Sequence, residues 1–285
     1  MRWESGRRSQ NVEDRRGRRV GGVGLGTGGI GMLVVVLGLA WLTGQNPIDL
    51  LQMVEQAPAG PGYADTAAAP PADDPQAQFV SVVLADTEDT WSRLFADGDD
   101  RYEPPVLVLF TGAVDSACGR AGAAVGPFYC PGDRKVYLDL SFFQELARRF
   151  DAPGDFAQAY VVAHEVGHHV QTLIGVSAEV NRLRAGAGEA ESNRLSVRQE
   201  LQADCLAGVW GYHARSRDLL EPGDVEEGLR AAAAIGDDTL QEGGQGYVRP
   251  ETFTHGTSAQ RVEWLRRGLA SGRMDACDTF SATLR

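Results

Sequence analysis

Two histidines four residues apart carry the clearest chemical signal in this sequence. His164 and His168 stand in the run Ala-His-Glu-Val-Gly-His-His-Val, and Glu165 directly follows the first histidine. Residues at i and i+4 share one face of a helix, so both imidazoles can bind the same metal ion. An adjacent glutamate can reach a water on that metal, as in the HExxH pattern of zinc hydrolases. The spacing predicts zinc ligands at both histidines and a general base at Glu165.

The residues around this pair argue against histidines that are merely solvated on a surface. An unsatisfied histidine or glutamate would be costly on a buried helix. The flanking positions are mostly apolar, so we expect burial; they are Tyr160, Val161, Val162, Val166, Val170, Leu173 and Ile174.

A catalytic zinc needs a third protein ligand and one open position for water. The metzincin pattern would place a histidine at position 174, where this chain has isoleucine. The chain has a single Glu-x-x-x-Asp, from Glu200 to Asp204, and on a helix these carboxylates share a face. We predict that Glu200 is the third ligand and that Asp204 fixes the tautomer of a zinc-bound histidine. Weaker candidates for the third ligand are Glu189, Glu191 and His213.

The elements that must position these residues indicate an α+β domain. An apolar run at 106–110 predicts a buried strand, and residues 126–140 predict two short strands around a Pro-Gly-Asp turn. Helical patterns are expected at 90–95, 142–147, 155–173, 194–215, 223–235 and 258–271. Strands followed by helices are typical of α+β folds rather than alternating α/β folds.

Charge is distributed unevenly along the 285 residues. The net charge is −12, yet residues 1–19 carry seven arginines against three acidic residues. The acidic remainder argues against nucleic-acid binding, which needs a basic face. A hydrophobic share of 43% is too high for a disordered chain and too low for a multi-span membrane protein.

An uncharged segment at 20–44 follows the basic start, with its apolar centre at 30–42. It is long enough to cross a bilayer, and the arginines before it predict a cytoplasmic N-terminus. We therefore expect a single N-terminal transmembrane helix at the cell membrane, a cytoplasmic tail at 1–19 and an extracytoplasmic domain. A cleaved signal peptide is the rival interpretation, although no small-x-small cleavage site ends the apolar run, and a twin-arginine signal is a minor one.

Proline, alanine and glycine dominate residues 45–78, which predicts a linker. One folded domain is then expected at 79–285. A GxGxxG match at 24–29 lies inside the apolar segment, without the strand and helix that a dinucleotide site needs, and predicts no cofactor.

All four cysteines lie in the expected domain, which suits an oxidising compartment. They permit three pairings, of which we favour Cys118 with Cys130 and Cys205 with Cys277. The alternative is that Cys205 is a buried free thiol or a neighbour of the metal.

Several runs together resemble the neutral zinc metallopeptidase family of bacteria. The similar stretches begin at Cys118, Gly126, Lys135, His164, Glu200 and Thr254 and read CG, GPFYCP, KVYLDLSFF, HEVGHHVQ, ELQADCLAG and THGTS. The resemblance covers residues 79–280. It implies a zincin-like fold with a small sheet, helices that carry HExxH and ExxxD, and a gluzincin-type zinc site. Members also tend to have an N-terminal membrane anchor.

The run that begins at Thr254 resembles the segment that returns to the active site in membrane-associated prenyl-protease-like gluzincins. That resemblance implies that His255 donates a hydrogen bond to the developing oxyanion and that Arg261 orients nearby carboxylates. The same run can simply begin a helix, with Thr257 or Ser258 as its cap. Both interpretations can hold together.

The leading functional hypothesis is a membrane-anchored zinc metalloendopeptidase that hydrolyses peptide or protein substrates. By analogy with other zincins, a substrate strand is expected to pair with a sheet edge near 136–140. The alternatives are a catalytically silent zinc domain that binds a partner, and a zinc amidase that acts on cell-wall peptides.

Overall fold

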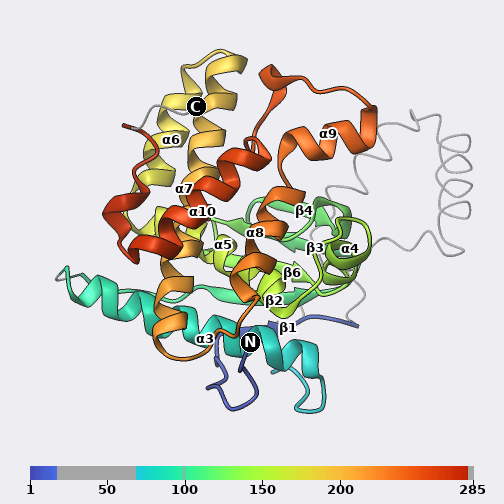
Figure 1. The fold of residues 1–285 in the computed structure, drawn as a ribbon, viewed down its shortest axis with the longest axis vertical. Coiled ribbons are helices and arrows are strands. Elements are labelled where there is room, and N and C mark those ends of the chain that lie inside the picture. Colours follow the sequence, from blue (N-terminus) through green and yellow to red (C-terminus); the bar gives the residue numbers. More distant parts are fainter. Residues whose placement is uncertain (18–68, 99, 282–285) are drawn as a thin grey trace, which may run out of the picture. The chain divides into compact units, whose positions relative to one another are not determined.

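The computed structural model describes residues 1–17, 69–98 and 100–281 (Figure 1). The strands are β1 (Val12–Asp14), β2 (Val106–Phe110), β3 (Ala113–Ser116), β4 (Gly119–Gly122), β5 (Phe128–Cys130) and β6 (Lys135–Asp139). The helices are α3 (Pro75–Ala96), α4 (Phe142–Arg148), α5 (Asp155–Leu173), α6 (Val176–Ala185), α7 (Glu189–Ser216), α8 (Asp224–Ala234), α9 (Asp237–Gln245) and α10 (Ser258–Ser271). Short 3-10 turns are η1 (Ala123–Val125), η2 (Pro250–Thr252) and η3 (Met274–Cys277).

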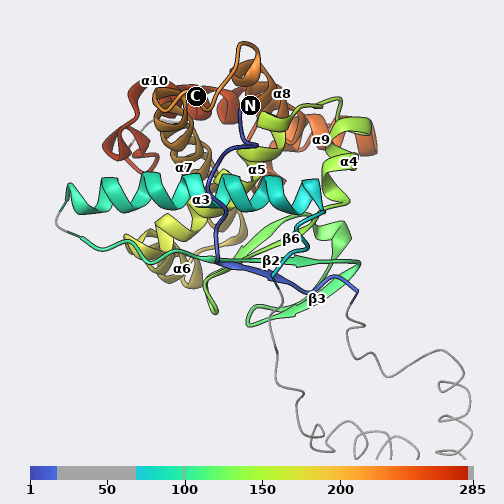
Figure 2. The ribbon, with the colours of Figure 1, turned by 90° about the horizontal axis from the view of Figure 1, so that it is seen from below.

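A four-stranded sheet has the order β1-β2-β6-β5, in which β1, β2 and β6 are parallel and β5 is antiparallel to β6. Successive side chains of a strand point to opposite faces. Leu107 and Leu109 therefore enter the main core, whereas Val108 and Phe110 pack in a smaller cluster with Val114 of the β3–β4 hairpin. Figure 2 shows the strands on one side and α8 and α10 on the other, with α3 and α5 between them.

The α+β interpretation agrees with these elements, and the strand at 106–110 and the helix at 155–173 are confirmed to the residue. The helix expected at 90–95 is the end of the longer α3, whose start is capped by Asp74 through the amides of Gln76 and Ala77. Helices α6 and α9 are not predicted by the sequence patterns, because both segments are short and rich in polar or glycine residues.

The central helices pack unusually closely where glycines meet. A Cβ on Gly268 of α10 would lie 2.0 Å from the carbonyl oxygen of Cys205 on α7. A Cβ on Gly208 would lie 2.3 Å from the carbonyl oxygen of Leu265. Because neither glycine has a side chain, the backbones of α7 and α10 can touch directly.

The structure forms both favoured disulfides. Cys118, in the turn between β3 and β4, bonds to Cys130 at the end of β5, and Cys205 on α7 bonds to Cys277 in η3. No free cysteine is found in the described residues, which hold all four. The first bond ties the hairpin to the edge of the sheet, and the second ties the C-terminal turn to α7.

The N-terminal segment corrects the expected domain organisation. Residues 1–16 belong to the same compact unit as 68–285, instead of forming a separate basic tail. β1 pairs in parallel with β2, in the register Val12 with Leu107 and Asp14 with Leu109.

The expected fold class is corrected in its transmembrane helix. Within the described residues, no helix has both the length and the apolar character that a membrane crossing requires. The segment expected to span the membrane, 20–44, and most of the expected linker at 45–78 lie outside the described residues. What stands is an α+β domain to which the first sixteen residues contribute a strand.

A buried carboxylate fastens this N-terminal segment to α3. Glu88 accepts hydrogen bonds from the Ser9 hydroxyl, from Asn11 Nδ2 at 2.8 Å and from Arg7 at 3.0 Å. Its side chain is only 8% exposed, whereas the side chain of Asp89, which also binds Arg7, is 55% exposed. Glu88 therefore joins three donors of the N-terminal segment, of which Ser9 is buried.

We expect Glu88→Ala to lower the free energy of unfolding by about 1–3 kcal/mol, because Ser9 and Asn11 lose their acceptor. Asp89→Ala is the matched control and should cost under about 1 kcal/mol, as exposed ion pairs do. Denaturant titration measures both values. Equal effects of the two substitutions would contradict the assignment of Glu88 as the fastening point.

Candidate metal centre

The two helices that carry the chemistry are held in close contact. α5 carries His164, Glu165 and His168, both histidines reach Glu200 on α7, and most of α5 is buried. At the contact, a Cβ on Gly167 would lie 3.0 Å from the carbonyl oxygen of Ala203 on α7. Glycine at this position lets the HExxH helix approach the helix that carries Glu200.

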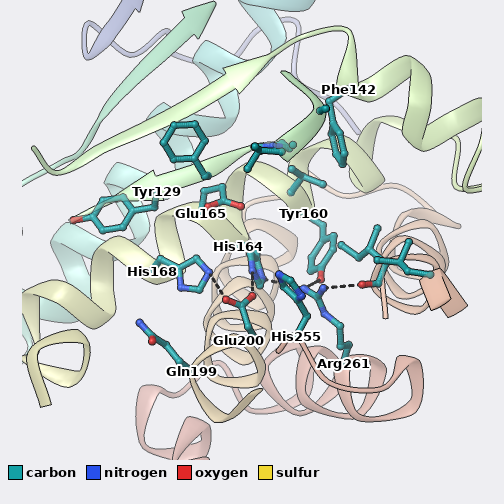
Figure 3. Close-up of a pocket in the computed structure, with 18 of the residues that line it drawn as sticks. Tyr129, Phe142, Tyr160, His164, Glu165, His168, Gln199, Glu200, His255 and Arg261 are labelled. Carbon is teal, nitrogen blue, oxygen red and sulfur yellow. Dashed lines mark hydrogen bonds and ion pairs between the residues drawn. The ribbon is translucent and has the colours of Figure 1, made fainter. Parts of the chain in front are cut away.

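The expected ligand residues converge on one point (Figure 3). His164 Nε2 lies 3.1 Å from one oxygen of Glu200, and His168 Nε2 lies 3.4 Å from the other. Ligand atoms from these three residues all lie within 4.8 Å of one another. Two imidazoles and one carboxylate in this arrangement match the His₂Glu set that catalytic zinc sites use.

The remaining ring nitrogens are engaged by acceptors. His164 Nδ1 lies 2.8 Å from Asp204 Oδ1, and His168 Nδ1 lies 2.9 Å from Gln171 Oε1. With the proton on Nδ1 in each ring, both Nε2 lone pairs are directed toward the shared point. The donor set therefore fits a divalent cation such as zinc.

Asp204 is the centre of a fully buried network. Its carboxylate accepts hydrogen bonds from the Tyr160 hydroxyl at 2.5 Å and from Arg261 Nε and Nη2, each at 2.9 Å. Burial alone would raise the pKa of Asp204, but Arg261 and His164 hold it at about 2. Asp204 is thus anionic and can orient the imidazole of His164, and Arg261 orients Asp204 in turn.

The electrostatics of the three converging residues favour a bound cation. Burial would lower the pKa of His164, yet Asp204 and Glu200 raise it to about 10. Burial would raise the pKa of Glu200, but His168 and His164 hold it well below its ordinary value. The attraction of the carboxylates therefore outweighs the cost of burying positive charge at this point. A metal ion can supply that positive charge as well as a proton can.

Glu165 faces a cavity of about 580 Å³ that opens over the converging residues. The cavity is bounded by α5, by residues 123–131, by α4 and by α6. Burial raises the pKa of Glu165 above its ordinary value. A carboxylate with raised proton affinity beside a metal position is suited to take up and release a proton.

His255 also lines this cavity, and its hydrogen-bond partner Asp237 does not. Its Nδ1 lies 3.1 Å from Asp237 Oδ1, while Asp237 Oδ2 accepts the backbone N–H groups of Thr254, His255 and Gly256. The hydrogen bond to Asp237 raises the pKa of His255. The helix entry expected in the same run is present too, because Thr257 caps α10 with a capping box.

The weaker candidate ligands lie elsewhere. Glu191 forms an exposed ion pair with Arg194, and Glu189 begins α7 in the exposed first turn. His213 binds the carbonyl oxygen of Gly272 at 3.0 Å, near the opposite end of α7. None of the three lines the cavity.

Two partners of the site have local signals in the sequence that the metal-ligand patterns do not include. Tyr160 precedes His164 by four residues and shares its acceptor Asp204, and Gln171 follows His168 by three residues and accepts from it, so each lies on the same helix face as its histidine. Asp237 gives no such signal, because it reaches His255 from eighteen residues away through a loop.

The sheet edge that borders the cavity is β5, not the region 136–140 expected from the sequence. β6 is paired on both sides, with β2 and with β5, and offers no free edge. β5 is joined to α5 by Tyr129, whose hydroxyl lies 3.0 Å from His169 Nδ1. His169 Nε2 donates to the carbonyl oxygen of Glu103, and burial lowers its pKa to about 4, so this imidazole is neutral and structural.

Comparison with known proteins agrees with this geometry. Residues 1–280 match the family described as "Putative neutral zinc metallopeptidase". "Uncharacterized protein YpfJ" of Escherichia coli K12 is 47% identical over 292 residues, which cover 100% of both chains. "Uncharacterized protein Rv2575" of Mycobacterium tuberculosis H37Rv is 47% identical over 192 residues, or 64% of each chain. No solved structure matches. The chain belongs to the neutral zinc metallopeptidase family, and its metal cofactor is Zn²⁺.

Proposed function

We propose that this protein is a zinc metalloendopeptidase in which His164, His168 and Glu200 hold the metal and Glu165 is the general base. The observation that carries the proposal is the convergence of two imidazole Nε2 atoms and one carboxylate within 4.8 Å, directly beneath a cavity that Glu165 also lines. A purely structural zinc site would be closed by a fourth ligand and would not need Glu165.

A zinc ion bound by these residues supplies Lewis acidity, which acidifies a water molecule and polarises the scissile carbonyl. Glu165 takes a proton from the attacking water and passes it to the leaving amine. Asp204 keeps the proton of His164 on Nδ1, and Gln171 does the same for His168, so neither ring competes for the proton in transfer. Arg261 keeps Asp204 ionised during the cycle.

His255 stabilises the negative charge that develops on the carbonyl oxygen. Its side chain is half exposed in the cavity wall, and the hydrogen bond from Nδ1 to Asp237 leaves Nε2 as the donor toward substrate. A positioned imidazolium at this place acts as one arm of an oxyanion hole. Asp237 fixes both the ring and the loop that carries it.

The substrate is a peptide that binds in extended form along β5. Among the described strands, β5 has β6 as its only partner, so its outer edge can accept a further strand. Phe128 and Tyr129 of β5 both line the cavity, which places this edge beside Glu165. We also propose that the domain works in an oxidising compartment, because all four cysteines form disulfides.

Glu165→Gln should retain zinc and lose peptide cleavage by about 10²–10⁴-fold, the usual contribution of a general base. Zinc content by mass spectrometry and cleavage of a mixed peptide library measure the two effects. Glu179→Gln, on the exposed side of α6, is the control and should match the wild type. If the zinc-loaded wild type cleaves no peptide, the silent partner-binding alternative replaces this proposal; release of cell-wall amides alone would favour the amidase.

Loss of a residue that only orients a metal ligand typically weakens metal binding by about 10–100-fold. Glu200→Ala removes a proposed ligand itself and should weaken zinc binding by more than that. Competition against a chelating dye measures the affinity. Glu191→Ala is the matched control on the same helix and should bind zinc as tightly as the wild type, since its partner is Arg194. Equal loss in both variants would refute the assignment of Glu200.

The pH dependence of kcat/KM should follow the protonation state of His255. The hydrogen bond to Asp237 raises the pKa of His255, so kcat/KM should fall as pH rises through that raised pKa and the imidazole loses its proton. Asp237→Asn removes the charge that stabilises the imidazolium, and the fall should move to lower pH. Asp238→Asn is the control, because Asp238 binds Ser258 and does not touch His255. Superimposable profiles for the wild type and Asp237→Asn would show that this histidine is not the titrating group.

A further inference from the structure

The cavity has two chemically different ends. Beyond His168, the lining comes from α6 and the middle of α7 and is polar: it contains Ser177, Asn181, Arg184 and Gln199. On the side of His255 and Arg261, the lining comes from α4, α5, the end of α8 and α9 and is apolar: it contains Phe142, Phe150, Val161, Ile235 and Leu240.

Two local contacts place Ile235 and Leu240 on the His255 side. Arg261 Nη1 donates to the carbonyl oxygen of Ile235 at 3.2 Å. Leu240 lies on α9 one turn after Asp237, which holds His255. Figure 3 shows Phe142 and Tyr160 on the side of His255 and Arg261, with Gln199 and His168 on the other. The two ends therefore lie on opposite sides of the metal position.

Leu240 is unusual among these residues because it is exposed, at 38% of its surface, in the wall of a cavity. Phe142 and Ile235 are half-buried and Val161 is buried, so the apolar lining includes both exposed and buried side chains. The charged residues at this end, Glu145 and Arg149, are exposed at the margin formed by α4. An apolar surface with a polar margin is typical of a pocket that receives an apolar side chain.

We propose that this end of the cavity is a specificity pocket for an apolar side chain, such as leucine or phenylalanine, next to the scissile bond of the peptide. The proposal rests on the proposed function, which places the scissile bond over Glu200 and the two histidines. The polar end then receives the residues on the other side of that bond, where Gln199 and Asn181 can bind peptide amides. The protein should therefore cleave preferentially on one side of apolar residues.

Two matched variants test the pocket. Leu240→Asp places a charge in the proposed wall, whereas Leu183→Asp places one on α6 at a leucine that is 39% exposed and does not line the cavity. Peptides that differ only in leucine, phenylalanine, lysine or aspartate beside the cleaved bond are compared by kcat/KM. The wild type and Leu183→Asp should prefer leucine over lysine by at least about 10-fold, as expected for one apolar group in a fitted pocket.

In Leu240→Asp, cleavage of the leucine peptide should fall by about 10-fold or more, and the preference should move toward lysine. A leucine-to-lysine ratio that is unchanged from the wild type would overturn the pocket, as would a wild type without apolar preference. Binding of the same peptides to zinc-loaded Glu165→Gln, measured by fluorescence anisotropy, separates the pocket from catalysis. Preferential binding of leucine peptides without cleavage by the wild type would support the pocket and overturn the proposed function alone.

Discussion

The arrangement of the helices depends on one buried carboxylate, that of Asp204. It has no exposure to water and receives hydrogen bonds from α5 through Tyr160 and His164 and from α10 through Arg261. A buried charge without partners would be strongly destabilising, so α5, α7 and α10 must meet where these groups are in reach. The helix arrangement that gives Asp204 its hydrogen-bond partners is therefore the same one that orients His164.

The close packing of these helices follows from that arrangement. Glycines at 167, 208 and 268 allow backbone contact between α5 and α7 and between α7 and α10, which short hydrogen bonds to a central side chain require. Cys205, directly after Asp204, is bonded to Cys277, so the C-terminal turn is fixed to the same turn of α7. Close backbone contact, the disulfide and the ion pair all fix the same short stretch of α7.

The site is predictable from the sequence where its geometry is local and unpredictable where it is not. His164 with His168, and Glu200 with Asp204, obey the i, i+4 rule within single helices, and the structure brings them together. Asp237 reaches His255 through a loop, and no spacing rule describes that contact. The excess of arginine in residues 1–19 suggests a basic tail, yet Arg15 and Arg16 pair with Glu13 and Asp14 two positions earlier, so these charges are compatible with a strand.

The two outer strands of the sheet differ in how well they could accept a further strand. Both outer strands have an unpaired edge among the described residues, but the two edges differ in chemistry. β1 is three residues long and carries Glu13 and Asp14, and Glu13 reaches Lys135 on β6 at 2.7 Å. Charged edge strands resist pairing with another chain, and because β5 is also three residues long, charge is what distinguishes the two edges. β5 instead presents Phe128, Tyr129 and Cys130, held to α5 by His169 and to the β3–β4 hairpin by the disulfide. If the proposed function holds, the uncharged edge beside the cavity is a better partner for an extended peptide than the charged edge of β1, and pairing there brings the peptide to the metal centre.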